Sequence, residues 1–304
     1  MVDGFVVEAF FKVTLLALQA MVPIALAAIG EVFAERAGVF NIGLEGIMLL
    51  SAFAASVGAE LFGSPWAGLA LGLAAGALVG LLHGGVTIYL GGEQTISGVG
   101  INVIALGIVS FGIPAVWRVY GAHTLAPSAF LPAISTPVGR LSYFILLTPL
   151  AAALTHWMLH KTLFGTRVKA CGEEPAAADV AGINVDGLRL VAVVYGAALA
   201  GLAGAYLSLD WTHLITNNLP AGRGWIAIAT VVFSKLNPWL AVLGGLVFGF
   251  FDTLGIWVST VPALSGLVPF QFVRMLPYLV TLLVVAGIGR ARFPKALGKP
   301  YKRE

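Results

Sequence analysis

The chain has 304 residues, of which 59% are hydrophobic and 10% are charged, and its formal net charge at pH 7 is +3. Soluble domains carry about 25% charged residues, so this composition excludes an ordinary water-soluble globule. The single cysteine, Cys171, excludes an internal disulfide and gives no basis for a metal cluster.

Apolar runs follow one another along the chain, and several approach the roughly 20 residues that a helix needs to cross a bilayer. We predict nine spans, at 8–30, 43–62, 66–90, 97–117, 141–160, 188–208, 222–235, 238–258 and 270–289. They must be helices, because a lone strand cannot satisfy its backbone polar groups in lipid. The predicted fold is therefore all-α, a polytopic integral membrane bundle of eight to ten spans forming one domain over residues 1–304.

Basic residues set the expected orientation, because cytoplasmic loops carry an excess of lysine and arginine. The tail at 290–304 contains six of them, which places it in the cytoplasm. Counting back through nine spans puts the N-terminus outside and the segment 161–187 inside. A re-entrant segment near 31–46 would alter this count. The predicted location is the cell membrane.

Glycines and small residues recur every four positions in two of the predicted spans. The first row is Gly68, Gly72, Gly76, Gly80 and Gly84, and the second is Gly196, Ala200 and Gly204. Such rows let another helix backbone approach closely, and we expect packing within one bundle rather than dimerisation. The stretches GSPWAGLALGLAAGALVG and LNPWLAVLGGLVFG also share a Pro-Trp start. With opposite orientations they would form an inverted repeat, as many transporters have.

The segment 161–187, KTLFGTRVKACGEEPAAADVAGINVDG, is the longest polar stretch between two spans. Its middle predicts a short helix, because Pro175 suits a first turn and Gly182 can end one. By pattern it is either a docking element or a solvated connection. The only Gly-Lys pair, at 298–299, lacks the spacing of a nucleotide-binding loop.

From Gly165 onward, the stretch GTRVKACGEEPAAADVAGINVDGLRL resembles the coupling segment of importer-type ABC permeases. The relatives it is most similar to transport branched-chain amino acids, simple sugars and nucleosides. The resemblance implies that the following residues contact the ATPase: Gly165, Arg167, Lys169, Gly172, Glu173, Glu174, Ala176, Ala177 and Gly182. Lys169 stands where an arginine is usual in the family.

Three further stretches are similar to the nucleoside branch: ERAGVFNIGLEGIML, EQTISGVGINVIA and GRGWIAIATVVFSKLNPWLAVLGGLVFG. The second departs from the family pattern around Glu93 and Asn102, so simple sugars and branched-chain amino acids stay as alternatives. The resemblance implies a second permease subunit of different sequence, a cytoplasmic ATPase that binds ATP and magnesium, and an extracytoplasmic substrate-binding lipoprotein. This chain itself would bind no cofactor, metal or nucleic acid, and would not be an enzyme.

The stretch FNIGLEG, residues 40–46, places polar groups and glycines between two long apolar runs. One interpretation is a helix break that faces the substrate pathway. In the other, Asn41 caps the next helix and Glu45 favours its N-terminus or pairs with Arg36. The candidate pathway residues are Phe40, Asn41, Glu45, Gln94, Thr95, Asn102, Arg223 and Trp225.

Two functions of other classes compete with a permease subunit. A transporter that works alone on an ion gradient would need buried ionisable residues, for which Glu45, Asp210 and Asp252 are available. An intramembrane hydrolase would use Ser97 with His156, but Ser97 lacks the Gly-x-Ser-Gly context of such a nucleophile.

Overall fold

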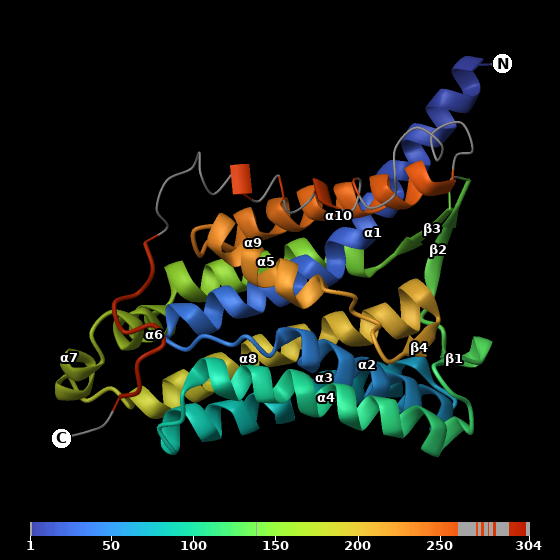
Figure 1. Cartoon of the computed structure of the whole chain (residues 1–304). Coiled ribbons are helices and arrows are strands. Elements are labelled where there is room, and N and C mark those ends of the chain that lie inside the picture. The colour runs from blue at the N-terminus through green and yellow to red at the C-terminus, as the bar shows by residue number, and fades with distance from the viewer. Residues whose placement is uncertain are drawn as a thin grey trace.

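The computed structural model describes residues 2–137, 139–260 and 292–301, together with positions 272, 275, 276, 279, 282 and 283. Long helices run side by side along one axis of the described part (Figure 1). The α-helices are α1 (Val2–Arg36), α2 (Leu44–Leu61), α3 (Pro65–Gly84), α4 (Gln94–Trp117), α5 (Phe144–Lys161), α6 (Leu163–Glu173), α7 (Pro175–Val180), α8 (Val185–Tyr206), α9 (Arg223–Phe233) and α10 (Pro238–Thr260).

Six of the described helices are long and apolar enough to cross a membrane: α1, α2, α3, α4, α8 and α10. The predicted span 141–160 is α5, whose 18 residues include two threonines and two histidines, and it is not among the six. The predicted span 222–235 is α9, which has 11 residues and is too short to cross alone. The predicted span 270–289 lies outside the described residues apart from isolated positions, so the count of nine remains a prediction.

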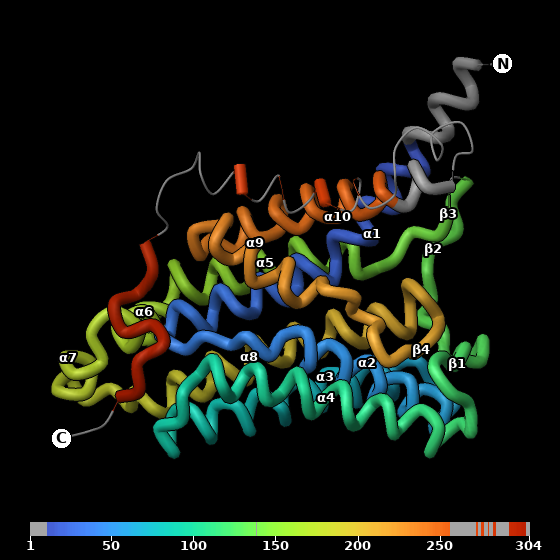
Figure 2. The backbone as a smooth tube through the Cα atoms, viewed as in Figure 1, coloured from blue at the N-terminus to red at the C-terminus, as the bar shows by residue number. Residues whose placement is uncertain are grey.

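The two ends of the bundle differ in structure, as Figure 2 shows. At one end lie the C-terminus of α1, the short helices α6 and α7, and the segment 292–301; we call this the hairpin end. The opposite end carries four short strands and is called the strand end. Pro65 and Pro238 begin α3 and α10 at opposite ends, although the inverted repeat itself remains a prediction.

The four strands correct the all-α prediction. β1 (Ala122–Thr124) pairs antiparallel with β4 (Leu214–Thr216), and β2 (Ala133–Thr136) pairs with β3 (Gly139–Ser142). They occur in the long connection between α4 and α5 and in the segment after α8. The chain is not α-helical at these positions, so its backbone groups have no partners within a helix. Pairing as strands supplies the missing hydrogen bonds.

The small-residue rows pack helices within this chain, as predicted. A Cβ on Gly76 would lie 2.5 Å from the Ala197 carbonyl oxygen, and one on Gly72 would lie 2.7 Å from the Ala205 Cβ. The glycines of α3 therefore face α8, and Gly68 faces Ala55 of α2 in the same way. Close backbone approach between α2, α3 and α8 replaces the large side chains that would fill a wider interface.

Candidate functional site

Between α1 and α2, residues 37–43 form a non-helical segment whose backbone is bound by side chains. The Phe40 amide donates to Gln94 Oε1 at 2.7 Å, and the Asn41 amide donates to Glu31 Oε1 at 2.7 Å. The Gly43 amide donates to Asn41 Oδ1 at 2.8 Å. Side chains of α1 and α4 thus supply the partners that a helix or sheet would otherwise give.

Asn102 of α4 contacts both sides of the start of α2. Its Oδ1 accepts from the Gly46 amide at 2.7 Å, and its Nδ2 donates to the Ile42 carbonyl at 3.1 Å. A Cβ on Gly46 would lie 2.8 Å from the Asn102 Cα, so the glycine permits this approach. A substitution at Asn102 would therefore change how α2 begins.

Glu45 joins the N-termini of two helices. It lies in the first turn of α2, and its carboxylate accepts from the Gly222 and Gly224 amides, each at 2.7 Å, where α9 begins. A helix N-terminus carries unsatisfied amides and a partial positive charge, both of which favour a carboxylate. A Cβ on Gly224 would lie 2.5 Å from the Glu45 nitrogen, so glycine is required there.

The helix break in FNIGLEG and the position of Glu45 at a helix N-terminus are confirmed, and two other details are wrong. The segment interrupts the helical structure between α1 and α2. Glu45 stabilises the N-terminus of its own helix, α2, and also that of α9, whose first amides it binds. Asn41 does not cap α2, because Gly43 is the N-cap residue and Asn41 binds the Gly43 amide just before the helix. Glu45 does not pair with Arg36, whose guanidinium donates to the Leu236 carbonyl at the hairpin end.

Arg223 begins α9 and forms an ion pair with Asp252 of α10, with Nη2 and Oδ2 2.6 Å apart. The side chains are 15% and 24% exposed. The Arg223 guanidinium also lies 4.6 Å from the ring centroid of Trp211, within the range of a cation–π contact. Asp252, which the sequence suggested only for the rival transporter, is therefore the partner of a predicted pathway residue.

Two predicted pathway residues are separate from these contacts. Thr95 is exposed at the start of α4, and Trp225 is 49% exposed on α9. Two side chains that were not among the candidates also bind the segment 37–43. Glu31 is buried in α1, and an acidic residue inside an apolar helix is the sequence signal that could have identified it. His83 Nε2 lies 3.3 Å from the Phe40 carbonyl.

The hydrolase alternative had paired Ser97 with His156. In the structure Ser97 Oγ lies 2.9 Å from His83 Nδ1, while the His156 ring stacks on His160 with centroids 4.3 Å apart. His83 Nε2 faces a carbonyl, which accepts and never donates, so Nδ1 accepts from the serine hydroxyl. The Ser97–His156 pair is therefore wrong, and the contacts of His83 position Phe40.

The segment 161–187 contains two helices rather than one. The predicted short helix is α7, which begins at Pro175, and Gly182 follows it at φ +79°. α6 was not predicted, because polar residues and glycines interrupt its apolar ones, so that it shows no apolar run. It buries a single face containing Val168, Cys171 and two glycines.

The predicted coupling residues divide into three groups by exposure. Gly165 and Gly172 are buried, and a Cβ on either would overlap a backbone carbonyl, of Met158 or Arg36 respectively. Lys169 and Glu173 are partly buried. The exposed group consists of Arg167, Glu174, Ala176, Ala177 and Gly182. The two buried glycines thus hold α6 against the bundle, and the exposed group lies on its outer surface.

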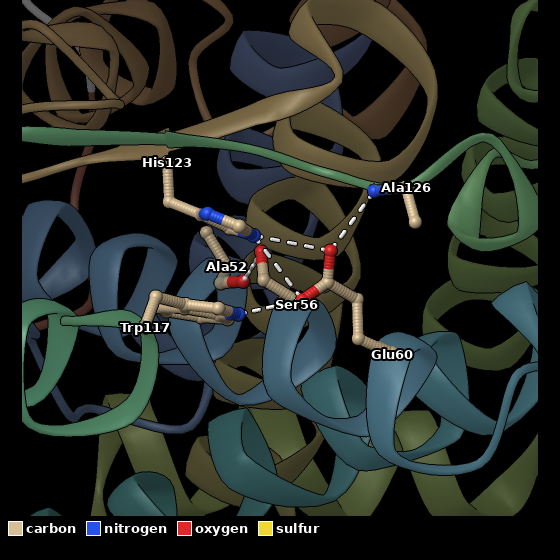
Figure 3. Close-up of polar contacts among 6 residues, drawn as sticks. All are labelled: Ala52, Ser56, Glu60, Trp117, His123 and Ala126. Carbon is tan, nitrogen blue, oxygen red and sulfur yellow. Dashed lines mark hydrogen bonds and ion pairs between the residues drawn. The ribbon is translucent and has the colours of Figure 1, made fainter. Parts of the chain in front are cut away.

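At the strand end, Glu60 of α2 binds the connection that follows α4 (Figure 3). Its carboxylate accepts from Trp117 Nε1 at 2.5 Å, from His123 Nε2 at 3.1 Å and from the Ala126 amide at 2.9 Å. The Trp117 and His123 rings stack with centroids 4.5 Å apart. One carboxylate therefore fixes the first nine residues after α4, 118–126, over the end of α2.

Comparisons with known proteins identify the family of this chain. The family described as the branched-chain amino acid transport system permease component matches residues 13–285. The guanosine ABC transporter permease protein NupQ of Bacillus subtilis is 38% identical over 301 residues, which cover 92% of each chain. The nucleoside ABC transporter permease protein NupC of Lactococcus lactis is 33% identical, over 92% of this chain and 93% of its own.

A third relative has a different substrate in its name. TsgC13 of Haloferax volcanii, an ABC transporter permease protein provisionally assigned to glucose, is 31% identical over 94% of this chain and 96% of its own. No solved structure matches the chain. The family match covers most of the sequence and the apolar helices fit it, so this chain belongs to the branched-chain amino acid transport system permease family and is a multi-pass membrane component of an ABC transporter.

Proposed function

We propose that this chain forms part of the translocation pathway of an ABC importer for nucleosides. The observation that carries the proposal is its 38% identity to a guanosine permease over 92% of both chains. The 33% identity to a nucleoside permease of another bacterium supports the same substrate class.

The pathway itself is proposed to pass the junction of α2 and α9. Broken helices at membrane depth leave backbone groups that can face water or substrate. Phe40, Asn41, Glu45, Gln94 and Asn102 surround one side of that junction, and Arg223 lies on the other. Thr95 and Trp225, which are exposed, would meet substrate only if a partner subunit covers them.

The partners are proposed from the resemblance and from exposure at the hairpin end. Leu163 and Val180, at the ends of the α6–α7 pair, are 80% and 92% exposed, which suits docking to a cytoplasmic ATPase. That ATPase would bind ATP and magnesium, and this chain would have no ATPase site of its own. A second, different permease subunit and an extracytoplasmic lipoprotein complete the complex. The hairpin end then faces the cytoplasm, and the N-terminus lies outside.

Reconstitution tests the proposal. The chain is combined with its neighbouring permease, ATPase and lipoprotein in liposomes, and ATP hydrolysis is measured with guanosine, uridine, ribose, glucose and leucine. We expect stimulation by a nucleoside and uptake of the same compound. Stimulation by leucine instead would contradict the nucleoside assignment, and failure to associate with any ATPase would overturn the permease role.

A sugar is the second candidate, because TsgC13 is 31% identical over a similar share of the chain. Ribose and glucose in the panel distinguish it from the first. Stimulation by either sugar without a response to nucleosides would replace the proposed substrate and keep the proposed partners.

A further inference from the structure

Arg189, the fifth residue of α8, is the largest fully buried side chain at the hairpin end and is 2% exposed. Its guanidinium donates to three backbone carbonyls: Nε to Ala37 at 3.1 Å, Nη2 to Cys171 at 3.1 Å and Nη1 to Lys299 at 3.2 Å. The three acceptors come from segments far apart in sequence, namely the end of α1, α6 and the segment 292–301.

The acceptors explain how a cation can be buried there. Ala37 follows the C-terminus of α1, and Cys171 lies in the last turn of α6. The C-terminal carbonyls of helices are unsatisfied and carry a partial negative charge, which favours a cation. Within the described residues no carboxylate forms an ion pair with Arg189. The guanidinium is thus stabilised by geometry that exists only while α1, α6 and α8 keep their present positions.

Further backbone contacts close the same junction. The Ala296 amide donates to the Gly172 carbonyl at 2.9 Å, and the Gly298 amide donates to the Gly38 carbonyl at 3.2 Å. A Cβ on Gly38, at φ +91°, would lie 3.0 Å from Arg189 Nη2. The segment 292–301 therefore bridges α6 and the start of the non-helical segment 37–43. The two also pack closely, since a Cβ on Gly38 would lie 3.2 Å from the Gly172 Cα.

That segment continues to Glu45. Its backbone is bound by Gln94, Glu31 and Asn102, and two residues after it the Glu45 carboxylate accepts from the amides that begin α9. Packed and hydrogen-bonded elements of this kind can transmit a displacement when they have two discrete arrangements. A shift of α6 together with the start of α8 would reach the α2–α9 junction through this continuous set of contacts.

We propose that Arg189 is a positioning residue that makes α6, the segment 292–301 and residues 37–43 move together. Movement of the α6–α7 pair by the ATPase is thereby converted into movement at Glu45. The proposal rests on the proposed function, since it requires an ATPase that docks on α6 and α7. A purely structural role would instead predict loss of folded complex with no change in the transport obtained per ATP hydrolysed.

The test uses the complete reconstituted complex with Arg189→Lys, which keeps the charge and loses the three-way donor geometry. Arg118→Lys, at an exposed residue of the strand end, is the matched control. Assembled complex, basal ATPase activity, nucleoside-stimulated ATPase activity and uptake are measured together. We expect Arg189→Lys to lower uptake per ATP at least fivefold while ATP hydrolysis continues, and Arg118→Lys to match the wild type.

An unchanged ratio of uptake to ATP hydrolysis in the Arg189→Lys complex would overturn the proposal, even when total uptake falls with the amount of complex. A wild-type complex that shows no nucleoside stimulation points instead to failure of the proposed function. The two failures are therefore separated by the wild-type measurement.

A second variant leaves Arg189 in place, for the case in which Arg189→Lys does not assemble. Gly172→Ala would force α6 away from the Arg36 carbonyl, and Gly107→Ala, with open space around its Cβ, is the control. We expect the first to lower uptake per ATP and the second to leave it unchanged. Equal ratios in both variants would contradict the proposal.

A double-mutant cycle tests the route from Arg189 to Glu45. Arg189→Lys, Glu45→Gln and the double variant are compared by uptake per ATP. If both residues act in the same route, the fold-loss of uptake per ATP in the double variant is clearly smaller than the product of the two single fold-losses. Losses that multiply would show independent action and would remove Glu45 from the proposed route.

Discussion

The two ends of the molecule are each organised by one charged side chain, but they are organised differently. At the hairpin end Arg189 is 2% exposed and donates to carbonyls of three separate segments. At the strand end the Glu60 side chain is 20% exposed and accepts from three groups that belong to one stretch, residues 117–126.

The difference concerns what is lost when each contact breaks. Water can replace the partners of a partly exposed carboxylate, so such contacts contribute modestly. Carbonyls around a buried guanidinium have no such replacement, and leaving them unpaired costs the full desolvation penalty. The hairpin end is therefore held as one unit, whereas the connection at the strand end can open without unfolding the bundle.

The largest expected effect is at Arg189. Arg189→Met leaves two buried carbonyls and one partly buried carbonyl without their donor, and we expect a loss of stability on the order of 3 kcal/mol. Thermal unfolding of the purified chain in detergent measures it, with Arg118→Met as an exposed control. A melting temperature equal to that of the control would remove the contrast between the two ends.

The next effect is expected midway between the ends, at the α2–α9 junction. Gly224→Ala places a Cβ 2.5 Å from the Glu45 nitrogen, and overpacking of this kind costs about 1–3 kcal/mol. We expect uptake to fall about tenfold, since 1.4 kcal/mol corresponds to that factor. Normal uptake at equal expression would mean that α9 can separate from Glu45 without consequence.

A smaller effect is expected at the strand end. Glu60→Gln keeps one accepting oxygen for three donors, and we expect a loss of about 1 kcal/mol. Hydrogen exchange over residues 118–131 should quicken while exchange in α2 and α8 stays constant. Ser56→Ala, which removes a bond to Ala52 one turn away, is the control and should leave that stretch protected.

The smallest effect concerns pH and also belongs to the strand end. Burial lowers the pKa of His213, and the nearby Arg140 guanidinium lowers it further. Because the unfolded chain then takes up the proton first, stability is full above pH 7 and decreases as pH falls through about 6.5. The melting temperature at pH 7.5 and pH 5.5 should differ less in His213→Gln than in the wild type. Equal differences would exclude His213.

Much of the fold could be predicted because long apolar runs have few alternatives in a membrane protein. The start of α3 at Pro65 and the end of α7 before Gly182 both follow from local chain chemistry. α6 was not predicted, because polar residues and glycines interrupt its apolar ones and its buried face is set by contact with α1. The four strands were not predicted because strands of three or four residues are too short to show an alternating hydrophobic pattern.

The candidate site was predicted by residue type but not by partner. Glu45, Asn102 and Arg223 each bind a residue of another element. The amides that Glu45 binds, however, lie 177 and 179 residues away in the sequence. Periodicity reports which face of a helix is buried and says nothing of such distant partners. Arg189 illustrates the limit most clearly, since its acceptors are backbone carbonyls, which every residue provides.

The position of Glu45 has an electrostatic consequence. α2 and α9 point toward opposite ends of the bundle, and their N-termini meet at this carboxylate (Figure 1). Each helix N-terminus is equivalent to roughly half a positive charge, so two of them and one carboxylate sum to about zero. Among the described residues, the one arginine beside it, Arg223, is neutralised by Asp252. A solute passing this junction would therefore meet balanced charge, a setting that suits an uncharged nucleoside or sugar.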